Sequence, residues 1–274
     1  MKNYDKDRYT SINSETWDKW AENGCEWTIP VTHDEFLSAK ESGKVRVYLT
    51  PCVTVPDEWL GDLRGKRLLG LASGGAQQMP LFAAAGAVCT VFDFSDSQLE
   101  KERIMSEREG YAIDIVKGDM SKPLPFPDDS FDIIFHPVSN CYVRDVRHIW
   151  RECARLLVPG GRLLAGFDNG LNFLFDDTLT EPLTLKNRLP FDPLEMDDKE
   201  FRRMRDNAEG IQFSHSMEEQ IGGQLEAGLC LRALYEDRDR DGALRNYVPQ
   251  LYGDPLGKAR ITPLYDLMKG CENQ

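Results

Sequence analysis

Residues 67–78 read Arg67-Leu68-Leu69-Gly70-Leu71-Ala72-Ser73-Gly74-Gly75-Ala76-Gln77-Gln78, and this stretch decides the fold. An apolar run of strand length breaks into small residues and then continues as a segment compatible with a helix. Roughly twenty residues later, the spacing typical of such units, a second apolar run ends in Asp93. The pattern is typical of a βαβ unit that binds a nucleoside-bearing cofactor. Small residues let the backbone and a helix N-terminus approach the ligand, and the carboxylate accepts the ribose hydroxyls.

From this stretch onward the chain alternates between strand and helix patterns. The expected strands cover residues 67–71, 87–92, 113–116, 131–135, 162–167, 211–214 and 229–235. The expected helices cover residues 77–85, 97–108 and 146–157, with a further one that Ser216 caps and that stops near Gly228. For the second of these helices, Ser97-x-x-Glu100 is the expected capping box. The alternation predicts an α/β, Rossmann-like, seven-stranded and mostly parallel sheet with helices on both faces.

Three further segments surround the alternating region, which we assign to residues 61–236. Residues 1–60 contain four of the five tryptophans but are too short for a separate core, so we expect an N-terminal cap across the mouth of the main domain, with a helix at residues 15–22. Residues 170–210 interrupt the alternation and are expected to form a lid-like insertion over the carboxyl edge of the sheet. Residues 237–274 form a C-terminal extension with no assignable pattern.

The composition argues against nucleic acid as a partner. The 274 residues include 46 acidic and 33 basic ones, and the net charge of −13 repels phosphate backbones. No apolar run approaches membrane-spanning length, so no membrane partner is expected. The seven cysteines are scattered without a CxxC pair, and the four histidines have no metal-ligand spacing. These features predict a cytoplasmic protein with neither disulfides nor a metal site.

A second carboxylate narrows the choice of cofactor. Asp119 follows the expected third strand within Gly118-Asp119-Met120. Because the ends of neighbouring parallel strands face one crevice, Asp93 and Asp119 should flank one nucleoside. Asp119 suits the adenine amine, whereas it would repel a pyrophosphate. With Phe94 and Met120 on the two faces of the adenine ring, the pattern favours an adenosine cofactor without phosphates.

The order of these elements resembles the class I S-adenosylmethionine-dependent methyltransferases. The resemblance is to their small-molecule branch, the type 11 group that includes quinone-biosynthesis enzymes. It is carried by Gly118-Asp119-Met120, by the run Pro-Phe-Pro-Asp-Asp-Ser-Phe-Asp-Ile-Ile at residues 125–134, and by the helix-Pro-Gly-Gly-strand pattern at residues 146–164. The family fold implies that the last strand runs antiparallel, and the segment 216–235 fits the closing helix and strand.

The resemblance implies S-adenosylmethionine as cofactor and a defined set of binding residues. They are Ala72, Ser73, Gly74, Gln78, Asp93, Phe94, Ser95, Gln98, Gly118, Asp119, Met120 and His136. The chain departs from the family's first motif, because Gly70 stands in place of the usual acid, and Ala72 and Ala76 replace glycines. The missing acid normally helps to hold the cofactor's amino group. Gln77, Gln78, Ser73 or the backbone at His136 are the candidates to replace it.

Methyl transfer from a sulfonium is a direct displacement, so the enzyme mainly aligns the reactants and excludes water. A base is needed only for a hydroxyl or a protonated amine. The candidate catalytic residues are His136, as a general base or else a strand-end residue bonded to backbone, and Tyr142, which either binds substrate or packs against the cofactor.

The leading hypothesis is a methyltransferase that acts on a small-molecule acceptor, whose identity and nucleophilic atom the sequence does not indicate. A non-catalytic protein that binds S-adenosylmethionine is the first alternative, in line with the Gly70 departure. A nucleotide-dependent oxidoreductase is disfavoured because the pattern G-x-G-x-x-G is absent. An RNA methyltransferase is disfavoured by the charge.

Overall fold

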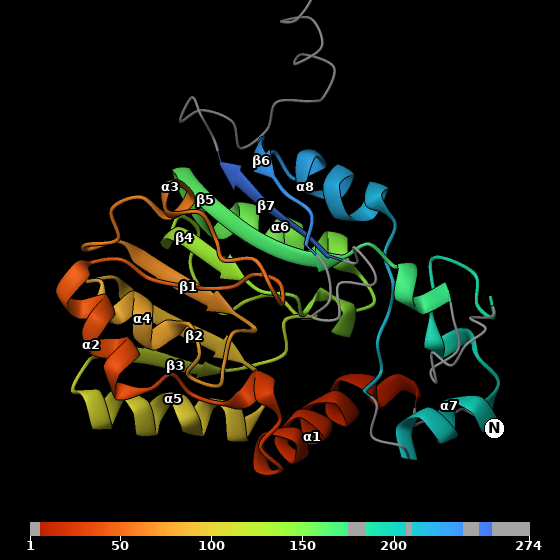
Figure 1. The fold of residues 1–274 in the computed structure, drawn as a ribbon. Helices are drawn as coiled ribbons and strands as arrows, with labels where there is room; N and C mark the ends of the chain where they lie inside the picture. Colours follow the sequence, from red (N-terminus) through yellow and green to blue (C-terminus); the bar gives the residue numbers. More distant parts are fainter. Residues whose placement is uncertain (1–5, 175–184, 207–209, 238–246, 254–274) are drawn as a thin grey trace, which may run out of the picture.

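The computed structural model describes residues 6–174, 185–206, 210–237 and 247–253, which are arranged around one sheet (Figure 1). The strands are β1 (Arg67–Leu71), β2 (Val88–Asp93), β3 (Ile113–Lys117), β4 (Phe131–His136), β5 (Leu157–Asp168), β6 (Leu231–Leu234) and β7 (Tyr247–Gly253). Their order in the sheet is β3-β2-β1-β4-β5-β7-β6. β1 to β5 pair in parallel, and β7 pairs antiparallel with both β5 and β6. The predicted α/β, Rossmann-like class with a mostly parallel sheet is confirmed.

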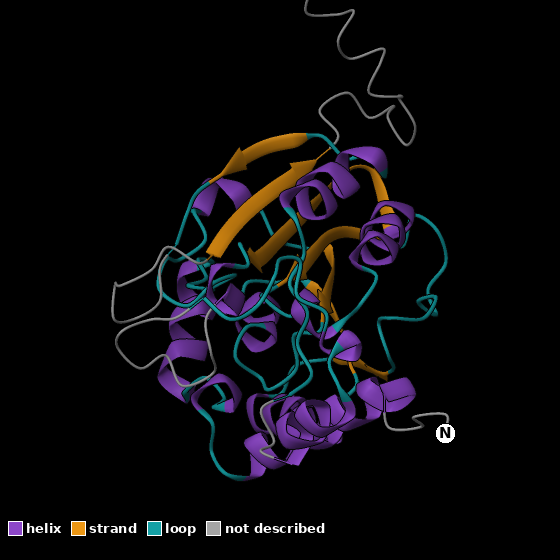
Figure 2. Ribbon diagram, turned by 90° about the vertical axis from the view of Figure 1, so that its right-hand side faces the viewer, coloured by secondary structure: helices purple, strands orange, loops and turns teal. Residues whose placement is uncertain are grey.

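Helices lie on both sides of this sheet (Figure 2). The α-helices are α1 (Tyr9–Glu22), α2 (His33–Ser42), α3 (Asp57–Leu60), α4 (Met79–Ala84), α5 (Asp96–Glu109), α6 (Val146–Leu156), α7 (Asp198–Asp206) and α8 (Gly223–Glu226). Short turns of 3-10 helix occur at Lys6–Arg8, Glu26–Thr28, Asn140–Tyr142, Leu171–Leu174 and Pro193–Glu195, and a π-helix at Glu218–Gly222 precedes α8.

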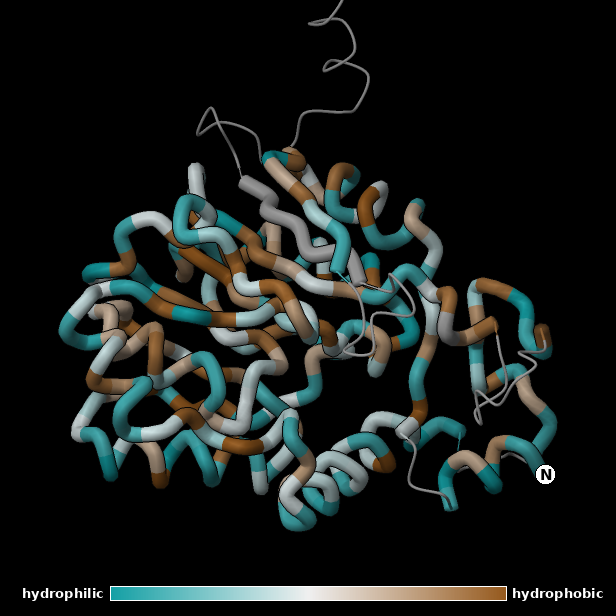
Figure 3. The backbone as a smooth tube through the Cα atoms, viewed as in Figure 1, coloured by the Kyte–Doolittle hydropathy of each residue, from teal (hydrophilic) through white to brown (hydrophobic). Residues whose placement is uncertain are grey.

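The two faces of the sheet carry two separate apolar cores. Successive strand residues point to opposite faces, so Leu68 packs in one core with Phe82 of α4, and Leu69 packs in the other with Trp150 of α6. All four side chains are fully buried. The apolar colouring in Figure 3 follows the strands accordingly. Burial on both faces explains why the parallel strands read as continuous apolar runs.

One helix begins at a different residue than predicted, and another helix was not predicted. The hydroxyl of Ser95, not that of Ser97, caps α5 and accepts from the backbone N–H of Gln98 (3.1 Å). The helix α2 was missed because it is strongly charged and weakly amphipathic. Its signal was present in the capping box of Thr32 and Glu35, in which each side chain bonds the other's backbone N–H.

One predicted strand is absent, and another has a different direction than predicted. Residues 211–214 are not a strand, because their backbone groups bond elsewhere: Ile211 exchanges two hydrogen bonds with the Asn13 side chain, and Phe213 N–H donates to the Cys141 carbonyl. The segment 229–235 does contain a strand, β6 (Leu231–Leu234), but the strand that runs antiparallel in the sheet is β7. Pro249 lies inside β7 and made it look unlike a strand in the sequence.

The N-terminal cap packs against the main domain through α1 and α5. Asp18 of α1 accepts from the Ser95 hydroxyl (2.6 Å) and from the Ser97 N–H (3.0 Å). Lys101 of α5 donates to the carbonyls of Ala21 (3.1 Å) and Thr28 (2.6 Å). These bonds fix α1 beside the end of β2, where the cofactor was predicted to bind.

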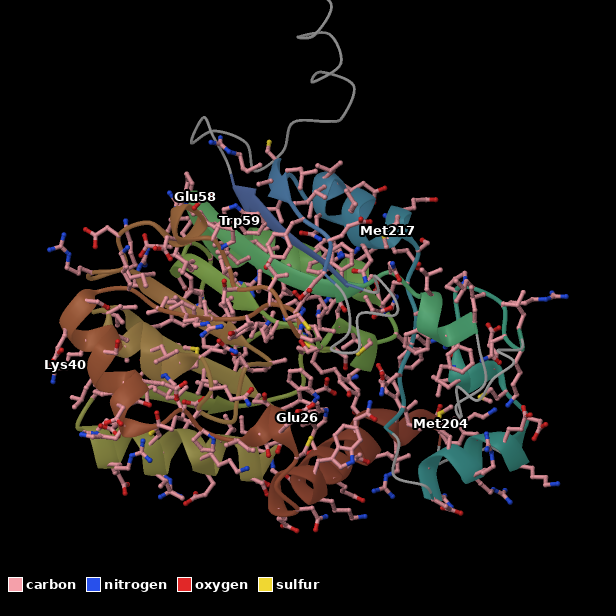
Figure 4. The ribbon with its side chains drawn as sticks, viewed as in Figure 1. Glu26, Lys40, Glu58, Trp59, Met204 and Met217 are labelled. Carbon is pink, nitrogen blue, oxygen red and sulfur yellow. The ribbon has the colours of Figure 1, made fainter. Side chains whose placement is uncertain are left out.

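The insertion after β5 lies on the far side of α1. Phe201 and Met204 of α7 form a third apolar cluster with Ile211 and Phe213. Met204, labelled in Figure 4, lies at the lower right of that view, across the molecule from Lys40 of α2 at the far left. Residues 175–184 and 207–209 of this insertion lie outside the described part, and its lid-like role remains a prediction.

Candidate functional site

A cavity of about 710 Å³ lies where the strands of the sheet end and the cap covers them. This volume is in the range of ligand pockets, roughly 300–1,000 Å³. Of the predicted cofactor residues, the following line it: Ala72, Ser73, Gly74, Gln78, Asp93, Phe94, Gln98, Gly118, Asp119 and Met120. The structure therefore brings together residues from the ends of β1, β2 and β3, as the topology of a parallel sheet requires.

Asp93 joins the first turn to the second strand. Its Oδ2 accepts from the Gly74 N–H and its Oδ1 from the Ser95 N–H, both at 3.0 Å. A Cβ on Gly74 would lie 3.0 Å from that Oδ2 and 2.9 Å from the Gln98 Cβ, so the close approach requires glycine. The carboxyl is only 7% exposed, and this burial raises its pKa against the opposing effect of the backbone N–H donors. A carboxylate has about four acceptor positions, so Asp93 can still accept a hydrogen bond from a ligand.

The third strand ends in the same wall. Gly118 N–H donates to the Asp93 carbonyl (2.9 Å), and a Cβ at position 118 would overlap the Phe92 ring. Asp119 is half-buried, and its Oδ1 accepts from the Ser121 N–H (2.8 Å). The Phe92 ring and the carboxylates of Asp93 and Asp119 thus form the part of the cavity wall at the ends of β2 and β3.

Two residues predicted to touch the cofactor lie outside the cavity wall. Ser95 is fully buried under Asp18, where it caps α5. His136 is also fully buried, with its Nδ1 on the Leu71 carbonyl (3.0 Å) and its ring against Trp150 (5.9 Å between centroids). Burial lowers the pKa of His136 to about 4. The structure thus favours the backbone-bonded interpretation of His136 over the general base.

Tyr142 does line the cavity, and so does Trp17 of α1. Their rings meet edge to face, with 5.7 Å between centroids, and Trp20 extends the group at 5.0 Å from Trp17. Tyr142 follows β4, whereas the tryptophans come from the cap. This aromatic wall therefore forms only when the cap is docked.

Sequence reasoning missed most of the cap's share in the wall. The cap residues that line the cavity are Thr10, Trp17, Glu26, Trp27, Ile29, Pro30, Val31, Thr32, Glu35, Arg46, Tyr48, Leu49, Thr50, Pro51 and Cys52. Glu26, labelled in Figure 4, lies between α1 and the sheet in that view. Only the density of tryptophans hinted at this role, because contacts between segments so far apart in sequence leave no local pattern.

Backbone hydrogen bonds hold the cap against the loops of the sheet. Val31 N–H donates to the Ala76 carbonyl (3.0 Å), and Val138 N–H donates to the Leu49 carbonyl (3.0 Å). Gly166 of β5 lies under Leu49, since a Cβ at 166 would overlap the Leu49 carbonyl oxygen. The cap segment is thus tied to the first turn, to the loop after β4 and to β5.

Asp237 anchors residues 50–53 of the cap. Its buried Oδ2 accepts from the Thr50 hydroxyl (2.8 Å) and from the N–H groups of Cys52 and Val53 (2.9 Å each). Three donors on one oxygen make this carboxylate the main polar tie between the end of β6 and the cavity wall.

Replacing Asp237 with alanine should lower the free energy of unfolding by about 2–3 kcal/mol, because three partly buried donors lose their acceptor. The measurement is urea unfolding of the variant beside Glu236→Ala, which removes an exposed neighbouring carboxylate. Equal stability of the two variants would contradict the anchoring role.

The position of the missing acid is filled. A Cβ on Gly70 would overlap the Met79 Sδ and lie 3.2 Å from the Ser73 Cβ. Met79 is fully buried in the core under β1. The departure from the family motif is therefore a packed arrangement rather than an open gap.

Gly70→Ala should lower the free energy of unfolding by about 1–3 kcal/mol through overpacking against Met79. In a Met79→Ala background the same change should cost little, because the thioether is gone. Urea unfolding of the four proteins in this cycle measures the coupling. An unchanged cost in the second background would show that the Met79 side chain is not the obstacle.

Comparison with known proteins identifies the family of this chain. A family model described as "Methyltransferase domain" matches residues 69–165. A protein of Bacillus subtilis (strain 168), named "Uncharacterized methyltransferase YbaJ", is 42% identical over 229 residues, which cover 82% of this chain and 89% of that protein. This chain belongs to the S-adenosylmethionine-dependent methyltransferases.

Other members of the methyltransferase family match more narrowly. A demethylmenaquinone methyltransferase of Corynebacterium glutamicum (strain R) is 37% identical over 101 residues, 36% of this chain and 40% of that enzyme. The crystal structure of an S-adenosylmethionine-dependent methyltransferase from Mesorhizobium loti superposes with a TM-score of 0.58 over 72% of this chain and 94% of that chain. At 18% identity the latter shows the shared fold alone.

The residues present fit the cofactor of the methyltransferases. The buried Asp93 carboxylate and the close approach at Gly74 suit a ribose, and the buried Ser73 Oγ has no hydrogen-bond partner among the described residues. No group of three or more possible metal ligands occurs in the described ranges, and no helix within them is long and apolar enough to span a membrane.

Proposed function

We propose that this methyltransferase transfers the methyl group of S-adenosylmethionine to a small, largely apolar and aromatic acceptor that binds under the cap. One observation carries the proposal: a single cavity contains both the carboxylates of Asp93 and Asp119 and the rings of Trp17 and Tyr142. The carboxylates suit a nucleoside, and the rings form a wall for a second, apolar molecule.

In this proposal the cofactor's nucleoside lies over the ends of β2 and β3. The Asp93 carboxylate accepts the ribose hydroxyls while it holds the Gly74 N–H. Asp119 accepts from the adenine amine, and Phe94 and Met120 enclose the ring. All of these residues line the cavity, which supports the assignment.

The acceptor takes the part of the cavity under the cap. The wall there is mostly apolar, with Trp17, Trp27, Ile29, Leu49, Val138 and Tyr142. Among the lining residues that the structure describes, Arg46 is the only lysine or arginine, so a polyanion such as nucleic acid finds little to neutralise its charge. The partial match to a demethylmenaquinone methyltransferase agrees with a small aromatic acceptor.

The chain's own task in the reaction is to align and to exclude water. The bound cofactor supplies an electrophilic methyl group on a sulfonium. The Trp17 and Tyr142 rings orient an apolar acceptor, and the docked cap keeps solvent out. No histidine lines the cavity, so the proposal assigns no histidine as base; the Tyr142 hydroxyl bonds the acceptor instead.

The experiment is methyl transfer with S-adenosylmethionine tritiated on its methyl group. A panel of hydroquinones and phenols is assayed by extraction into organic solvent, and total tRNA is assayed in parallel. Label that enters the extract supports the proposal. Label in tRNA alone would overturn it, and tight cofactor binding without any transfer to either would favour the non-catalytic alternative.

Tyr142→Phe should lower turnover of the acceptor about tenfold and leave affinity for S-adenosylhomocysteine within twofold, because a neutral hydrogen bond to the acceptor is lost. The matched control is Tyr111→Phe, which removes a buried hydroxyl outside the cavity wall. Steady-state rates and calorimetric titration give the two numbers. Equal rates for both variants would remove Tyr142 from the acceptor site.

A further inference from the structure

The amino-acid end of S-adenosylmethionine carries an ammonium and a carboxylate, and the protein must replace their water shells. At the end of β1, where the family places an acid, this chain has Gly70. The Met79 side chain fills the space beside Gly70, so the end of β1 supplies no carboxylate to the cofactor. The partners of the amino-acid end must therefore come from elsewhere in the cavity wall.

Ser73 is the polar side chain closest to the missing acid. Its Cβ lies 3.2 Å from where a Cβ of residue 70 would stand. Its Oγ is buried, lines the cavity and has no hydrogen-bond partner among the described residues. A buried hydroxyl without a partner is costly, and a ligand that bonds it removes that cost.

The cap brings one cation to the same cavity. Tyr48 N–H donates to the Gln78 Oε1 (3.2 Å), which places Tyr48 beside the end of the first turn. Arg46 lines the cavity, and its guanidinium carbon lies 5.8 Å from the centroid of the Tyr48 ring. An arginine stacked on an aromatic ring is held in place with its donors free to bind.

Arg46 differs from its neighbour Lys44 because no carboxylate among the described residues forms an ion pair with it. Both Lys44 and Arg46 are exposed, but Lys44 pairs with Asp57 at 3.5 Å and does not line the cavity. Within the described ranges no Asp or Glu lies within ion-pair distance of Arg46. Among the acids on the rim of the cavity, Glu35 is engaged with Thr32 in the capping box of α2.

We propose that Arg46 binds the carboxylate of the cofactor's amino-acid end and that the Ser73 hydroxyl accepts from its ammonium. A guanidinium offers two parallel donors to a carboxylate, which gives both energy and orientation. The inference rests on the proposed function. It means that recognition of the amino-acid end has moved from β1 to the cap, so cofactor binding and cap docking support each other.

Calorimetric titrations with three ligands distinguish the contact of Arg46 with the carboxylate from the contact of Ser73 with the ammonium. S-adenosylhomocysteine has both charged groups, 5′-deoxy-5′-(3-aminopropylthio)adenosine lacks the carboxylate, and methylthioadenosine lacks both. Arg46→Gln should weaken S-adenosylhomocysteine about tenfold to a hundredfold and leave the other two ligands within twofold. Ser73→Ala should weaken the first two ligands about tenfold and leave methylthioadenosine unchanged. Lys44→Gln, which removes a positive charge two residues away, should change none.

Each other outcome contradicts one part of the proposal. If Arg46→Gln weakens all three ligands alike, Arg46 only supports the cap; if it weakens none, it does not contact the cofactor. Ser73→Ala with unchanged affinities removes Ser73 from the ammonium site. Failure of the wild-type protein to bind S-adenosylhomocysteine would instead overturn the proposed function, and this inference with it.

Discussion

Asp93→Asn should weaken the binding of S-adenosylhomocysteine by at least a hundredfold. Two ribose hydroxyls would lose a charged acceptor, and hydrogen bonds to charged groups contribute about 1.5–3 kcal/mol each. The amide also has only one acceptor oxygen. The backbone N–H groups of Gly74 and Ser95 now occupy both oxygens of the carboxylate, so the variant loses part of the turn's support as well.

The measurement is calorimetric titration of S-adenosylhomocysteine, with NADH as a second ligand. The matched control is Asp96→Asn, an exposed carboxylate three residues away that pairs with Lys117 (2.6 Å). The control should bind like the wild-type protein, and NADH should bind none of the three. Affinity of Asp93→Asn within threefold of the wild-type value would place the nucleoside elsewhere in the cavity.

Glu102→Gln should raise the free energy of unfolding at pH 8 by about 3 kcal/mol and change it little at pH 5. Glu102 of α5 is fully buried behind the first turn, where its Oε1 accepts from the Ala76 N–H (2.7 Å). Burial raises its pKa from 4.5 to about 8, and Asp93 adds to the rise. The folded protein therefore keeps a proton on this carboxyl that the unfolded chain has already lost.

The direction of the pH dependence follows from this proton. Between pH 4.5 and about 8 the folded state binds more protons than the unfolded state, so stability falls as the pH rises. A glutamine keeps the acceptor for the Ala76 N–H and never ionises. The stability of the Glu102→Gln variant should therefore not fall with pH because of this residue. Asp168, whose pKa burial raises to about 6, contributes to both proteins and cancels in the difference.

Urea unfolding at pH 5 and pH 8 gives the four free energies. The matched control is Glu107→Gln, an exposed glutamate on the same helix that pairs with Arg103 (3.9 Å). Its difference from the wild-type protein should be the same at both pH values. A Glu102→Gln effect that also stays constant between pH 5 and pH 8 would mean that this carboxyl ionises normally in the folded protein.

The sequence predicted those parts of the site that lie within short continuous stretches of the chain. The strand ends at Asp93 and Asp119 came from apolar runs that stop at a carboxylate, and topology then required them to share one edge. The pattern failed for Ser95 and His136, because it gives the position of a residue along the chain but not whether its side chain faces the crevice or the core. Both side chains turn inward, where Asp18 and the Leu71 carbonyl bind them.

The sequence alone determined the parallel α/β sheet, the first turn and the adenosine character of the ligand, since these follow from periodicity, small residues and strand-end carboxylates within short stretches. Tertiary structure decided the rest. That Met79 fills the place of the missing acid, that Asp237 holds the wall at Thr50, and that Tyr48 of the cap bonds Gln78 after the first turn all depend on contacts between distant segments. Such contacts form only because burial of the cap against the sheet brings these groups together, and no local pattern records them.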